Sequence, residues 1–568
     1  MTSRSRAAPA GTPLVVAVDA GTTGARAVAF SLAGEMIAEV RRPYRISAPR
    51  PGWAEQDSRD WAEGAVAALR GLAGRIRSAG RIRAIGLTGQ CPTMVPADER
   101  GRPLRPGMLY RDNRAVAEAR QMRQRIGDAA LHQRTGHVPE AFHVGPKLAW
   151  LRRHEPAVFA RTRLVLQPRD VVLHRLTGIA RTDQTHANAT LFFNLRQRDW
   201  DPGLLGAFDV DPALFPPVLP PWEIAAELPR PAAAELGLDA GIPLVIGAAD
   251  SQCAAFGAGV AGPGPVSEMA GASSCLNSAV PDPLPDLRVT HYSHVVPGCF
   301  CTELGLNTTG AAIGWAVKAL GYPGYGELAA DAERFGRRLR RGPRPAGTGQ
   351  RSSRQDATAA DGGDGPAADG GGSPAAGGTD SGSSSRGPAA VAAAPLFLPY
   401  LGDGERDDPA ARGGFIGLSD RHDRAALAFA VIEGVALGVR SSLQVLEHAG
   451  SPLTELRVGG GGARLGLAGQ LKADLLGCPV LHLDLDPAAF GTAMLAAAAA
   501  GLSGEAADAT VGVLRRARQF VPSRWGSQFE LGRAAWFDQV RPSAAVHDPG
   551  GSSVAMTEEP PDHESQGR

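Results

Sequence analysis

The sequence predicts an α/β protein built from two large domains. Runs of apolar and β-branched residues, typical of buried strands, occur in both halves of the chain, at Leu14–Val18 and at Leu244–Ala249. Each half also contains a unit in which such a strand leads into a glycine turn with an aspartate close by. With 568 residues, 43% of them hydrophobic, the chain is long enough to bury two separate cores.

The elements of the first half follow in order along the chain. The strand at Leu14–Val18 ends in the glycine turn Asp19–Thr23, and a second strand is expected at Ala27–Phe30. Apolar residues at helical spacing predict a helix over Asp60–Ser78, and another buried strand follows at Ile82–Leu87. The remaining predictions for this half are a helix at Lys147–Arg152, an element at Leu164–Leu166, and a loop that holds Asp183.

The second half is expected to begin near Ile242. Asp250 stands at the end of its first strand, and Ser251–Gly257 then opens a helix. The other predicted elements of this half are a hairpin of small residues at Gly264–Ser274, a long amphipathic helix at Ala425–His448 ended by Gly450, and a short strand at Leu456–Val458 followed by the glycine run Gly459–Ala463.

Three segments are predicted to lie outside the folded domains as disordered chain: residues 1–13, about 341–392, and 546–568. The middle one is dominated by Gly, Ser, Ala, Asp and Pro and shows no apolar periodicity. Such a segment buries too little surface to offset the entropy of ordering it. The two domains are therefore expected at 14–241 and 242–545, with the second interrupted by an insertion that is either flexible filler or a partner-binding segment.

Composition argues against several classes of protein. The formal net charge is +1, so no global field draws the chain to nucleic acid or to an anionic membrane. The N-terminus lacks the apolar core of a signal peptide, and the longest apolar run, Ala488–Leu502, is mostly alanine and too short to span a bilayer. The six cysteines are scattered without a CxxC pair, which favours free thiols over disulfides or zinc. A cytoplasmic protein is expected.

The turn Asp19–Thr23 is the first candidate for chemistry. A strand that ends in a glycine turn brings backbone N–H groups close to an anion, and the hydroxyls of Thr22 and Thr23 add donors for phosphate oxygens. The carboxylate of Asp19 suits Mg²⁺, which prefers oxygen ligands, and Arg26 has the charge to neutralise a phosphate. The alternative is an ordinary β-hairpin turn.

Asp250 is the second candidate. It follows a wholly apolar strand, and the carboxyl ends of such strands are where open α/β sheets bind ligands. A carboxylate at that place can take a proton from an attacking hydroxyl. The alternative is a helix N-cap, for which aspartate is also well suited.

Two glycine loops of the second half complete the set of candidates. Gly459–Ala463 follows a strand and would let a flat ligand or a phosphate approach the backbone. Gly271–Ser274 is a candidate second phosphate loop. Taken singly, each has an ordinary turn as its alternative.

In their order along the chain, these motifs resemble the FGGY family of carbohydrate kinases over about Leu14–Val540, apart from the insertion. Val18–Thr23 is similar to the first phosphate motif of that family, and Gly247–Gly257 is similar to the segment that holds its catalytic aspartate. Further segments that resemble the family are Pro51–Asp57 with its Pro-Gly-Trp, Pro146–Leu151 with its Lys-x-x-Trp, Leu396–Leu418, and Gly460–Gly477, which looks like the adenosine-binding motif.

The resemblance implies two actin-like (ribonuclease H-like) domains of the hexokinase/actin ATPase type with a cleft between them. It also implies ATP and Mg²⁺, with the sugar against the first domain and ATP mainly against the second. Asp250 would be the general base and Asp19 the Mg²⁺ residue. The residues expected near the phosphates and the nucleotide are Asp19, Gly21, Thr22, Thr23, Arg26, Gly271, Ala272, Ser273, Gly310, Gly460, Gly461, Gly462 and Ala463.

The sugar-facing loop departs from the family pattern. Gln90 is followed by Cys91 and Pro92, where xylulokinases usually have Met-His and glycerol kinases have Arg-Glu. Glycerol is therefore not expected, whereas Gly101–Leu104 and Tyr110–Arg114 are more similar to xylulokinases. A ketopentose such as xylulose is the first expected substrate, and gluconate, ribulose, fuculose or a tetritol remain open. The residues expected to bind the sugar are Gln90, Cys91, Pro92, Tyr110, Asp112 and Asp250.

For two side chains of this region, a purely structural role is also considered. Cys91 is either an active thiol or a small residue that fills space, and the second is favoured. His186 follows Asp183 where the family often has an acidic or amide residue, and both are expected to be structural, with His186 a satisfied polar group.

The second phosphate loop also departs from the pattern, because Gly271–Ser274 stands where Gly-Thr-Ser-Gly is common. One hydroxyl is lost there, and a hydrogen bond to a charged group is worth about 1.5–3 kcal/mol. This change motivates one alternative function, a sugar-binding regulatory protein without catalysis. A chaperone-type ATPase is a second alternative, but it would need a substrate-binding domain after the ATPase. A small sugar is the expected partner, and a homodimer is left open.

We expect deletion of Gly347–Gly387 to leave sugar kinase activity intact, because that stretch holds no predicted site residue and no apolar pattern. The measurement is kcat of the deletion variant against the full chain. A large loss of kcat would show that the insertion takes part in the function.

Overall fold

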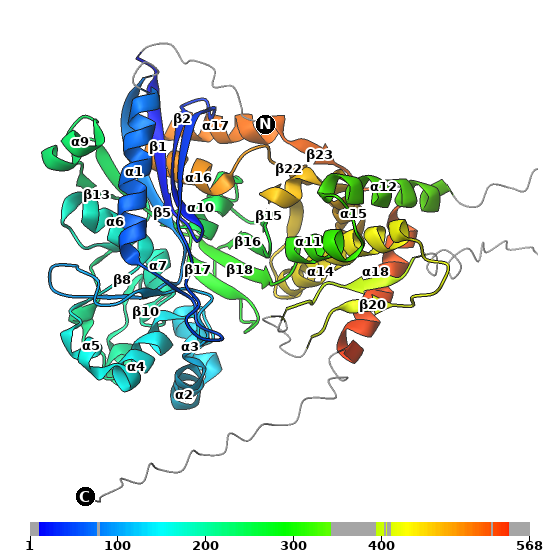
Figure 1. The fold of residues 1–568 in the computed structure, drawn as a ribbon, viewed down its shortest axis with the longest axis horizontal. Coiled ribbons are helices and arrows are strands. Elements are labelled where there is room, and N and C mark those ends of the chain that lie inside the picture. The colour runs from blue at the N-terminus through cyan, green and yellow to red at the C-terminus, as the bar shows by residue number, and fades with distance from the viewer. Residues whose placement is uncertain are drawn as a thin grey trace, which may run out of the picture.

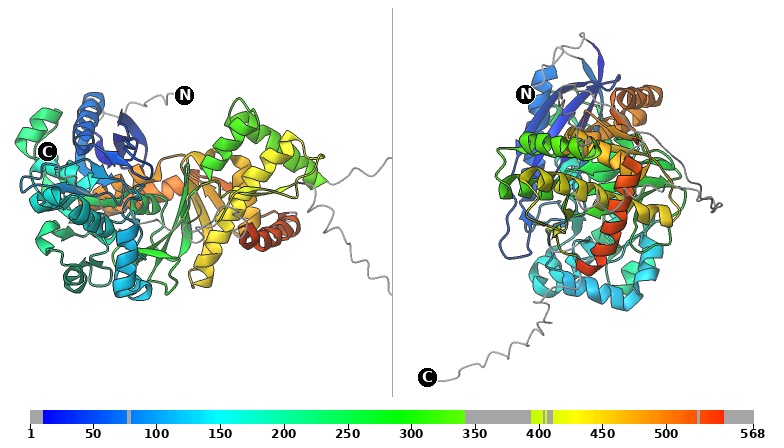
Figure 2. Two further views of the ribbon diagram at one scale, coloured as in Figure 1. Left: turned by 60° about the horizontal axis from the view of Figure 1, so that its bottom comes forward. Right: turned by 90° about the vertical axis from the view of Figure 1, so that its right-hand side faces the viewer.

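The computed structural model describes residues 11–76, 80–341, 394–402, 405, 411–523 and 526–544. The segments predicted to be disordered, 1–13, 341–392 and 546–568, lie outside the described residues except for residues 11–13 and 341. Figures 1 and 2 show two lobes side by side, each built around a β-sheet with helices against it.

The sheet of the first lobe has six strands in the order β13-β14-β5-β1-β2-β3. β1 pairs antiparallel with β2 and parallel with β5, and β14 continues the parallel part. The bounds of these strands are β1 Pro13–Ala20, β2 Gly24–Ser31, β3 Met36–Pro43, β5 Arg81–Gly89, β13 Ile224–Glu227 and β14 Pro243–Ala249. The strands predicted from apolar runs are therefore all present, one to four residues longer than expected.

Alternation along β1 explains why this sheet is covered on both faces. Leu14, Val16 and Val18 belong to the core shared with the helix α1 (Ser58–Ile76). Val15 and Ala17 point to the other face and pack in the core formed with α16 (Pro487–Ala499). Because both faces are apolar, a strand in the middle of this sheet is buried along its length. The first face is completed by α6 Pro168–Thr177 and α9 Arg230–Leu236.

The sheet of the second lobe repeats this scheme. Its seven strands have the order β17-β18-β16-β15-β21-β22-β23, with β15 antiparallel to β16 and parallel to β21. An antiparallel hairpin followed by two parallel strands thus occurs once in each lobe, at β1–β2 and at β15–β16. The second unit predicted from the sequence, the strand Leu244–Ala249 with Asp250, belongs instead to the first sheet. The bounds are β15 Gly264–Ala270, β16 Ser274–Val280, β17 Thr290–Ser293, β18 Phe300–Leu306, β21 Leu453–Gly459, β22 Val480–His482 and β23 Arg518–Phe520.

One helix dominates the core of the second lobe. α14 (Arg424–His448) occupies the predicted span, but it is buried on most of its surface and is not the amphipathic helix that was expected. This helix is long and apolar enough to cross a membrane. Most of its apolar stretch is, however, buried in the protein, where it contacts α12, α15 and β19. The elements around it are α11 Gly310–Ala319, α12 Tyr325–Arg341, α15 Gly466–Leu476, α18 Gly526–Ala544, β19 Leu396–Leu398 and β20 Gly414–Ile416.

A layer of short helices and two- or three-residue strands extends the first lobe, as Figure 1 shows below the first sheet. Its apolar centre includes Met94, Leu148, Leu151 and Phe192. The predicted helix at Lys147–Arg152 lies within α4. The bounds are β4 Glu55–Gln56, β6 Val95–Ala97, β7 Gly107–Met108, α2 Val116–Ile126, α3 Asp128–Thr135, α4 Val144–His154, α5 Pro156–Arg161, β8 Leu164–Leu166, β9 Thr182–Asp183, α7 Gln184–Asn188, β10 Phe193–Asn194, β11 Asp199–Trp200, α8 Pro202–Ala207, η1 Pro212–Leu214 and β12 Val218–Leu219.

The two lobes meet through α10 (Asp250–Gly257) and α16, which lie against each other next to the first sheet (Figure 1). Their backbones touch at two glycines. A Cβ on Gly491 would lie 1.9 Å from the carbonyl oxygen of Cys253, and a Cβ on Gly257 would lie 2.0 Å from that of Pro487. Only glycine allows such close packing of two helices. The helix α17 (Ser503–Arg516) follows α16 and packs beside it.

The predicted domain boundary at 241/242 is wrong. β14 was assigned to the second domain, but it pairs with β5 in the first sheet. The second sheet begins only with β15, at Gly264. Strand pairing between residues far apart in the chain, which no local pattern reveals, decides this assignment.

Candidate active site

The turn between β1 and β2 is held by side chains from outside the hairpin. Gln56 Nε2 donates to the carbonyl oxygen of Thr22 (2.7 Å), and Tyr44 Oη donates to that of Gly21 (2.5 Å). The amide N–H of Gln90 donates to the carbonyl oxygen of Ala20 (3.1 Å). The turn thus connects a β-hairpin, which was the alternative to a phosphate-binding turn. Its carbonyl oxygens accept hydrogen bonds from side chains and an amide outside the hairpin. This arrangement fixes the turn beside the buried carboxylate of Asp19.

Asp19 and Arg26 face each other across that hairpin, where they are register partners. Arg26 Nε donates to Asp19 Oδ2 (2.8 Å), and Arg26 Nη1 donates to Asp486 Oδ2 (2.5 Å). Burial raises the pKa of Asp19, and Arg26 opposes that rise. Arg26 was expected to face phosphates, whereas here its guanidinium lies between two carboxylates.

Asp250 lies at the carboxyl end of β14, as predicted, and it is the first residue of α10. Ala249 occupies the N-cap position, so the interpretation of Asp250 as an N-cap is wrong. Burial, and then the charge of Asp19, raise the pKa of Asp250 from 3.8 to about 7. A carboxylic acid that titrates near neutral pH, with a second carboxylate close by, is suited to accept a proton.

The backbone on both sides of Asp250 is held in a specific geometry. Gly247 has φ +68°, and a Cβ there would lie 1.8 Å from the carbonyl oxygen of Leu87, so a glycine is required at this bulge in β14. The amide of Ala249 donates to Thr185 Oγ1 (2.8 Å), whose hydroxyl donates to Asp183 Oδ2 (2.6 Å). Asp183 lies at the end of β9 and caps α7, where a loop was predicted. Through Thr185, this segment fixes the backbone next to Asp250.

Asp183 and His186 have the structural surroundings that the sequence predicted, with one difference. Asp183 is fully buried and accepts hydrogen bonds from Arg169, Thr185 and His186 Nδ1 (2.5 Å to the last). Burial alone would raise the pKa of Asp183, but His186, Arg169 and Thr185 together hold it below its usual range. The Nε2 atom of His186 is buried without a hydrogen-bond partner, so His186 is not the fully satisfied group that was expected.

The glycine-rich loops of the second lobe come together around the β15–β16 hairpin. The amide of Gly310 donates to the carbonyl oxygen of Gly271 (3.1 Å), and that of Ala311 donates to Ala272 (2.9 Å). A Cβ on Gly310 would lie 2.2 Å from the same oxygen of Gly271. On the other side, a Cβ on Gly462 would lie 2.5 Å from the Cβ of Ala270. Residues that were predicted from three separate segments therefore form one surface, which includes η2 (Gly461–Arg464).

A buried ion pair stabilises the β15–β16 hairpin. Lys472 Nζ lies 2.5 Å from Glu268 Oε2, and both side chains are almost fully buried. Ser274 Oγ donates to Glu268 Oε1 (2.9 Å) and lies 3.0 Å from Thr309 Oγ1, whose hydroxyl can donate to it. The hydroxyl of Ser274 is thus engaged within the protein, where the sequence left open a role at a phosphate.

We expect Glu268→Gln to destabilise the second domain by about 3–5 kcal/mol, because it leaves the ammonium of Lys472 buried without its counter-charge. Urea unfolding measures the change in the free energy of unfolding. Glu447→Gln, at an exposed position of α14, is the control and should be nearly neutral. Replacing both charges, as in Glu268→Leu with Lys472→Met, should recover much of the loss, and no recovery would contradict this explanation.

The two halves of the site are joined at the start of α16. Asp486, which binds Arg26 of the first lobe, is followed by Pro487 at the first position of the helix. A Cβ on Gly459, the last residue of β21, would lie 2.4 Å from Pro487 Cγ. The Asp19 hairpin is therefore connected through Asp486 and Pro487 to the strand that leads into Gly460–Ala463.

The predicted sugar loop lies beside the Asp19 hairpin. Gln90 is buried; its Nε2 donates to Gln56 Oε1 (2.9 Å), while its Oε1 is buried without a hydrogen-bond partner. Cys91 Sγ lies 3.6 Å from Gln167 Oε1, and burial together with the charges of Asp183 and Asp250 raises the pKa of this thiol. A thiol kept neutral fits the interpretation of Cys91 as a space-filling residue. All six cysteines are free, as predicted.

Two of the predicted sugar residues have other surroundings. Asp112 is fully buried and accepts hydrogen bonds from the amide of Ala54 (2.7 Å) and from Arg114 Nε (2.8 Å), so it fixes the loop before α2 and is not placed as a sugar ligand. Tyr110 is 36% exposed. Pro92 lies in the sugar loop, and its carbonyl oxygen accepts a bond from the buried ammonium of Lys147 (3.4 Å).

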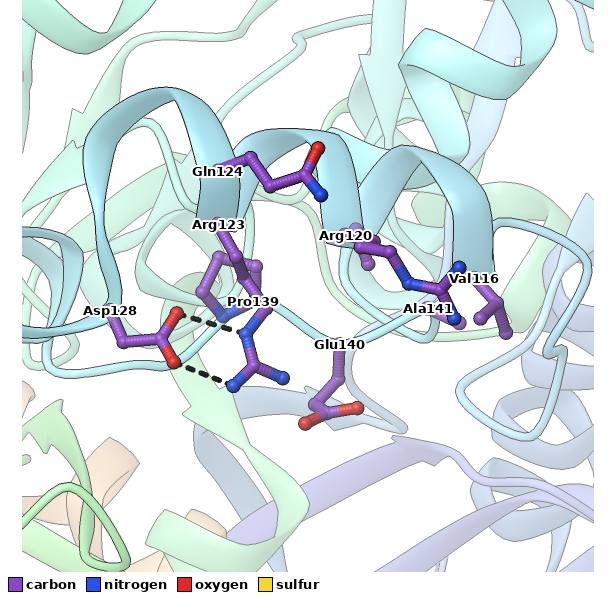
Figure 3. Close-up of a pocket in the computed structure, with 9 residues that line it drawn as sticks. Val116, Arg120, Arg123, Gln124, Asp128, Pro139, Glu140 and Ala141 are labelled. Atoms are coloured by element: carbon purple, nitrogen blue, oxygen red, sulfur yellow. Dashed lines mark hydrogen bonds and ion pairs between the residues drawn. The ribbon is translucent and has the colours of Figure 1, made fainter. Parts of the chain in front are cut away.

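A surface pocket of about 600 Å³ lies elsewhere on the first lobe, and none of the predicted site residues lines it. Figure 3 shows that Arg123 and Asp128 form a two-pronged ion pair at one side of it. The other residues around it are Val116, Ala119, Arg120, Gln124, Pro139, Glu140 and Ala141.

The residues around Asp19 suit a magnesium ion. Asp19 Oδ1 is buried and has no hydrogen-bond partner, so one carboxylate oxygen is open while the other holds Arg26. Within the described part of the chain, no group of three or more His, Cys, Asp or Glu side chains forms a preformed cage. A single carboxylate is typical of Mg²⁺ sites in which waters and substrate phosphates supply the other ligands.

Two acidic residues of the site were not predicted from the sequence. Glu303 on β18 accepts a hydrogen bond from Ser251 Oγ (2.9 Å), and its charge adds to the rise in the pKa of Asp250. Asp486 was not singled out either, although Asp-Pro before an alanine-rich helix is a recognisable helix start. Nothing in the local sequence around Glu303 marks it.

Two α/β lobes with an aspartate at their junction and glycine-rich hairpins opposite it are typical of two-domain, actin-like phosphotransferases. Residues 14–257 match the N-terminal domain of the FGGY family of carbohydrate kinases, and residues 267–500 match its C-terminal domain. The chain belongs to the FGGY family, and it is a sugar kinase.

Individual relatives agree with this assignment. The chain is 27% identical over 496 residues to a xylulose kinase of Escherichia coli, covering 86% of this chain and 90% of that one. It is 30% identical over 504 residues to a glycerol kinase of Gloeobacter violaceus, covering 87% and 90%. The crystal structure of xylulose kinase from Rhodospirillum rubrum has a TM-score of 0.76 and 28% identity, covering 94% and 99%.

Proposed function

We propose that this ATP-dependent sugar kinase phosphorylates a small uncharged sugar, with a ketopentose such as xylulose as the first candidate, and that Asp250 is its general base. The observation that carries the proposal is Asp250 itself, a partly buried carboxyl at a strand end whose pKa is raised to about 7. Support for a ketopentose comes from the several relatives named xylulose kinase. In this proposal the first lobe binds the sugar and the second binds most of ATP.

The proposed chemistry assigns a task to each half of the site. Asp250, in its carboxylate form, accepts the proton of the sugar hydroxyl that attacks the γ-phosphorus of ATP. The turn Gly21–Thr23 and the loops at Gly271–Ser273 and Gly460–Ala463 hold the phosphates and the adenosine. Mg²⁺, held by Asp19 Oδ1, would supply charge neutralisation to the phosphates. Closure of the lobes would exclude water, which competes with the sugar hydroxyl.

The chemistry of the sugar loop supports an uncharged substrate. Gln90 offers a buried amide oxygen without a partner, which is an acceptor for a sugar hydroxyl. Cys91 and Pro92 add no charge, so the loop lacks a cation that would favour an aldonate. The Nε2 atom of His186 is a second buried polar atom of this region without a hydrogen-bond partner.

The test is ADP release from Mg-ATP across ketopentoses, aldonates and polyols, with glycerol included because several relatives are named glycerol kinase. Wild type and Asp250→Asn are measured together. Turnover by the wild type that depends on one sugar, and its loss in the variant, would support the proposal. Binding of ATP and sugar without turnover would favour the regulatory, non-catalytic alternative.

A further inference from the structure

Lys147 on α4 is a fully buried lysine whose ammonium lies among main-chain carbonyl groups. Its Nζ donates to the carbonyl oxygens of Leu109 (2.7 Å), Met108 (3.3 Å) and Pro92 (3.4 Å). An ammonium has one hydrogen for each of these three acceptors. Pro92 belongs to the sugar loop, whereas Leu109 leads into the segment that carries Tyr110. One lysine thus joins the two segments that the sequence predicted to bind the sugar.

The carbonyl group of Pro92 depends on this lysine. Pro92 is buried, and a proline has no N–H, so the carbonyl is its one polar main-chain group. A buried carbonyl without a partner is costly, and Lys147 supplies the partner. The amide of the next residue, Thr93, donates to Gln167 Oε1 (3.3 Å). Two consecutive residues of the loop are therefore held by side chains from two different parts of the first lobe.

The charge on Lys147 is sensitive to pH in the neutral range. Burial lowers the pKa of Lys147 to about 7, and Arg114 adds to this effect, whereas Asp112 opposes it. Burial raises the pKa of Asp112, but hydrogen bonds from Arg114 and a backbone amide outweigh it, so Asp112 stays ionised. Cys91 is a neutral thiol, because burial raises its pKa. Glu118 of α2 is 3.6 Å from the histidine that ends α4.

We propose that Lys147 is a positioning residue of the sugar loop: its ammonium ties the Pro92 carbonyl to the segment before Tyr110 and so sets the affinity for the sugar. This inference rests on the proposed role of Gln90–Pro92 in binding the sugar. Lys147 does not touch the sugar in this account. Loss of one proton leaves two donors for three carbonyl oxygens, and the longest bond, to Pro92, is the one expected to be lost.

The first test compares Lys147→Met with wild type. Methionine has a similar length and no donor, so the tie to Pro92 is lost while the space stays filled. We expect the Kd for the sugar, measured by calorimetry, to rise about tenfold, and the Kd for ADP to change less than about twofold. The probe is xylulose, replaced by another sugar of the activity panel if the wild type turns that one over instead.

The matched control is Lys318→Met, which removes the charge of an exposed lysine on α11 in the second lobe. This variant should keep the wild-type Kd for the sugar, because Lys318 has no contact with the sugar loop in the hydrogen bonds described above. It separates the loss of a positive charge from the loss of the bond to Pro92.

The second measurement needs no substitution at Lys147. In Asp250→Asn the proposed base no longer titrates, and the Kd for the sugar is followed from about pH 6 to about pH 8.5. Lys147 is protonated at the lower pH and holds the loop, so we expect the Kd to rise about fivefold with a midpoint near pH 7. In Asp250→Asn with Lys147→Met, the Kd should not depend on pH over this range.

A sugar Kd within about twofold of wild type in Lys147→Met, with ADP binding intact, would overturn the inference. A sugar Kd that does not change with pH in Asp250→Asn would also overturn it, even if Lys147→Met does not fold. A pH dependence that persists in the double variant would assign the effect to another group. Failure of the proposed kinase function would appear in the wild type as no sugar-dependent turnover, whereas this inference is decided by sugar binding in the variants.

Discussion

Asp250→Asn is expected to lower kcat about 10³-fold while nucleotide binding is retained. General-base catalysis typically contributes 10²- to 10⁴-fold, and the amide cannot take the proton of the sugar hydroxyl. Asp250 is partly buried near Asp19 and Glu303, and asparagine has nearly the same size, so the replacement removes a charge from an acidic site without opening a cavity. The measurement is kcat from ADP release, with ATP affinity measured separately by calorimetry.

The control for this variant is Asp239→Asn, at an exposed position before β14, which should keep wild-type kcat. Near wild-type turnover in Asp250→Asn would place the base elsewhere in the site. Loss of ATP affinity in parallel with kcat would instead show that the substitution disturbs the fold of the site.

The pH dependence of the wild type follows from the raised pKa of Asp250. Below pH about 7 the group is mainly protonated and cannot act as a base, so kcat/KM should rise with pH and level off above that value. The free energy of unfolding should show the opposite dependence and decrease as pH rises. Because the folded protein holds this proton more tightly than the unfolded chain does, the stability contribution of Asp250 falls as pH rises from about 4 to about 7.

Asp250→Asn removes that unfavourable ionisation, and we expect the variant to be more stable than wild type at pH 8 by a few kcal/mol, with a smaller difference at pH 5. Thermal unfolding at the two pH values measures this. Equal stability of the two proteins at pH 8 would mean that the carboxylate of Asp250 is better solvated or better neutralised than its burial indicates.

Gly491→Ala is expected to destabilise the protein by about 2–3 kcal/mol and to lower kcat, because a side chain there has no room. Its Cβ would lie 1.9 Å from the carbonyl oxygen of Cys253 in α10, and backbone cannot move aside as a side chain can. Separating α10 from α16 would shift Asp250, the first residue of α10, away from the phosphate site. Urea unfolding and kcat are the two measurements.

Gly504→Ala in α17 is the matched control, since a Cβ at that position meets nothing within 4 Å. It should be neutral or more stable by roughly 0.5–1 kcal/mol, the usual gain of alanine over glycine in a helix. A Gly491→Ala variant as stable and as active as the control would show that the two helices are free to move apart.

The elements, the order of the motifs and the family follow from local patterns in the amino-acid sequence. Apolar runs marked β1, β5 and β14 within a few residues of their bounds, because buried strands need continuous apolar residues. The place of Asp250 at the end of such a run, and the glycines where backbones approach closely, also follow from local chemistry. Local periodicity was less reliable for α14, which looked amphipathic but is buried on most sides.

Which residues share a site depends on contacts between distant segments, and these are visible only in the folded protein. β14 belongs to the first sheet because it pairs with β5, and Asp112 is occupied by Arg114 and the amide of Ala54. Arg26 holds Asp486 across 460 positions, and Glu303 reaches Asp250 from another sheet. A carboxylate or an arginine looks the same in sequence whether it binds a ligand or another side chain. Its partner is set by packing between distant segments, and that packing is what the fold alone supplies.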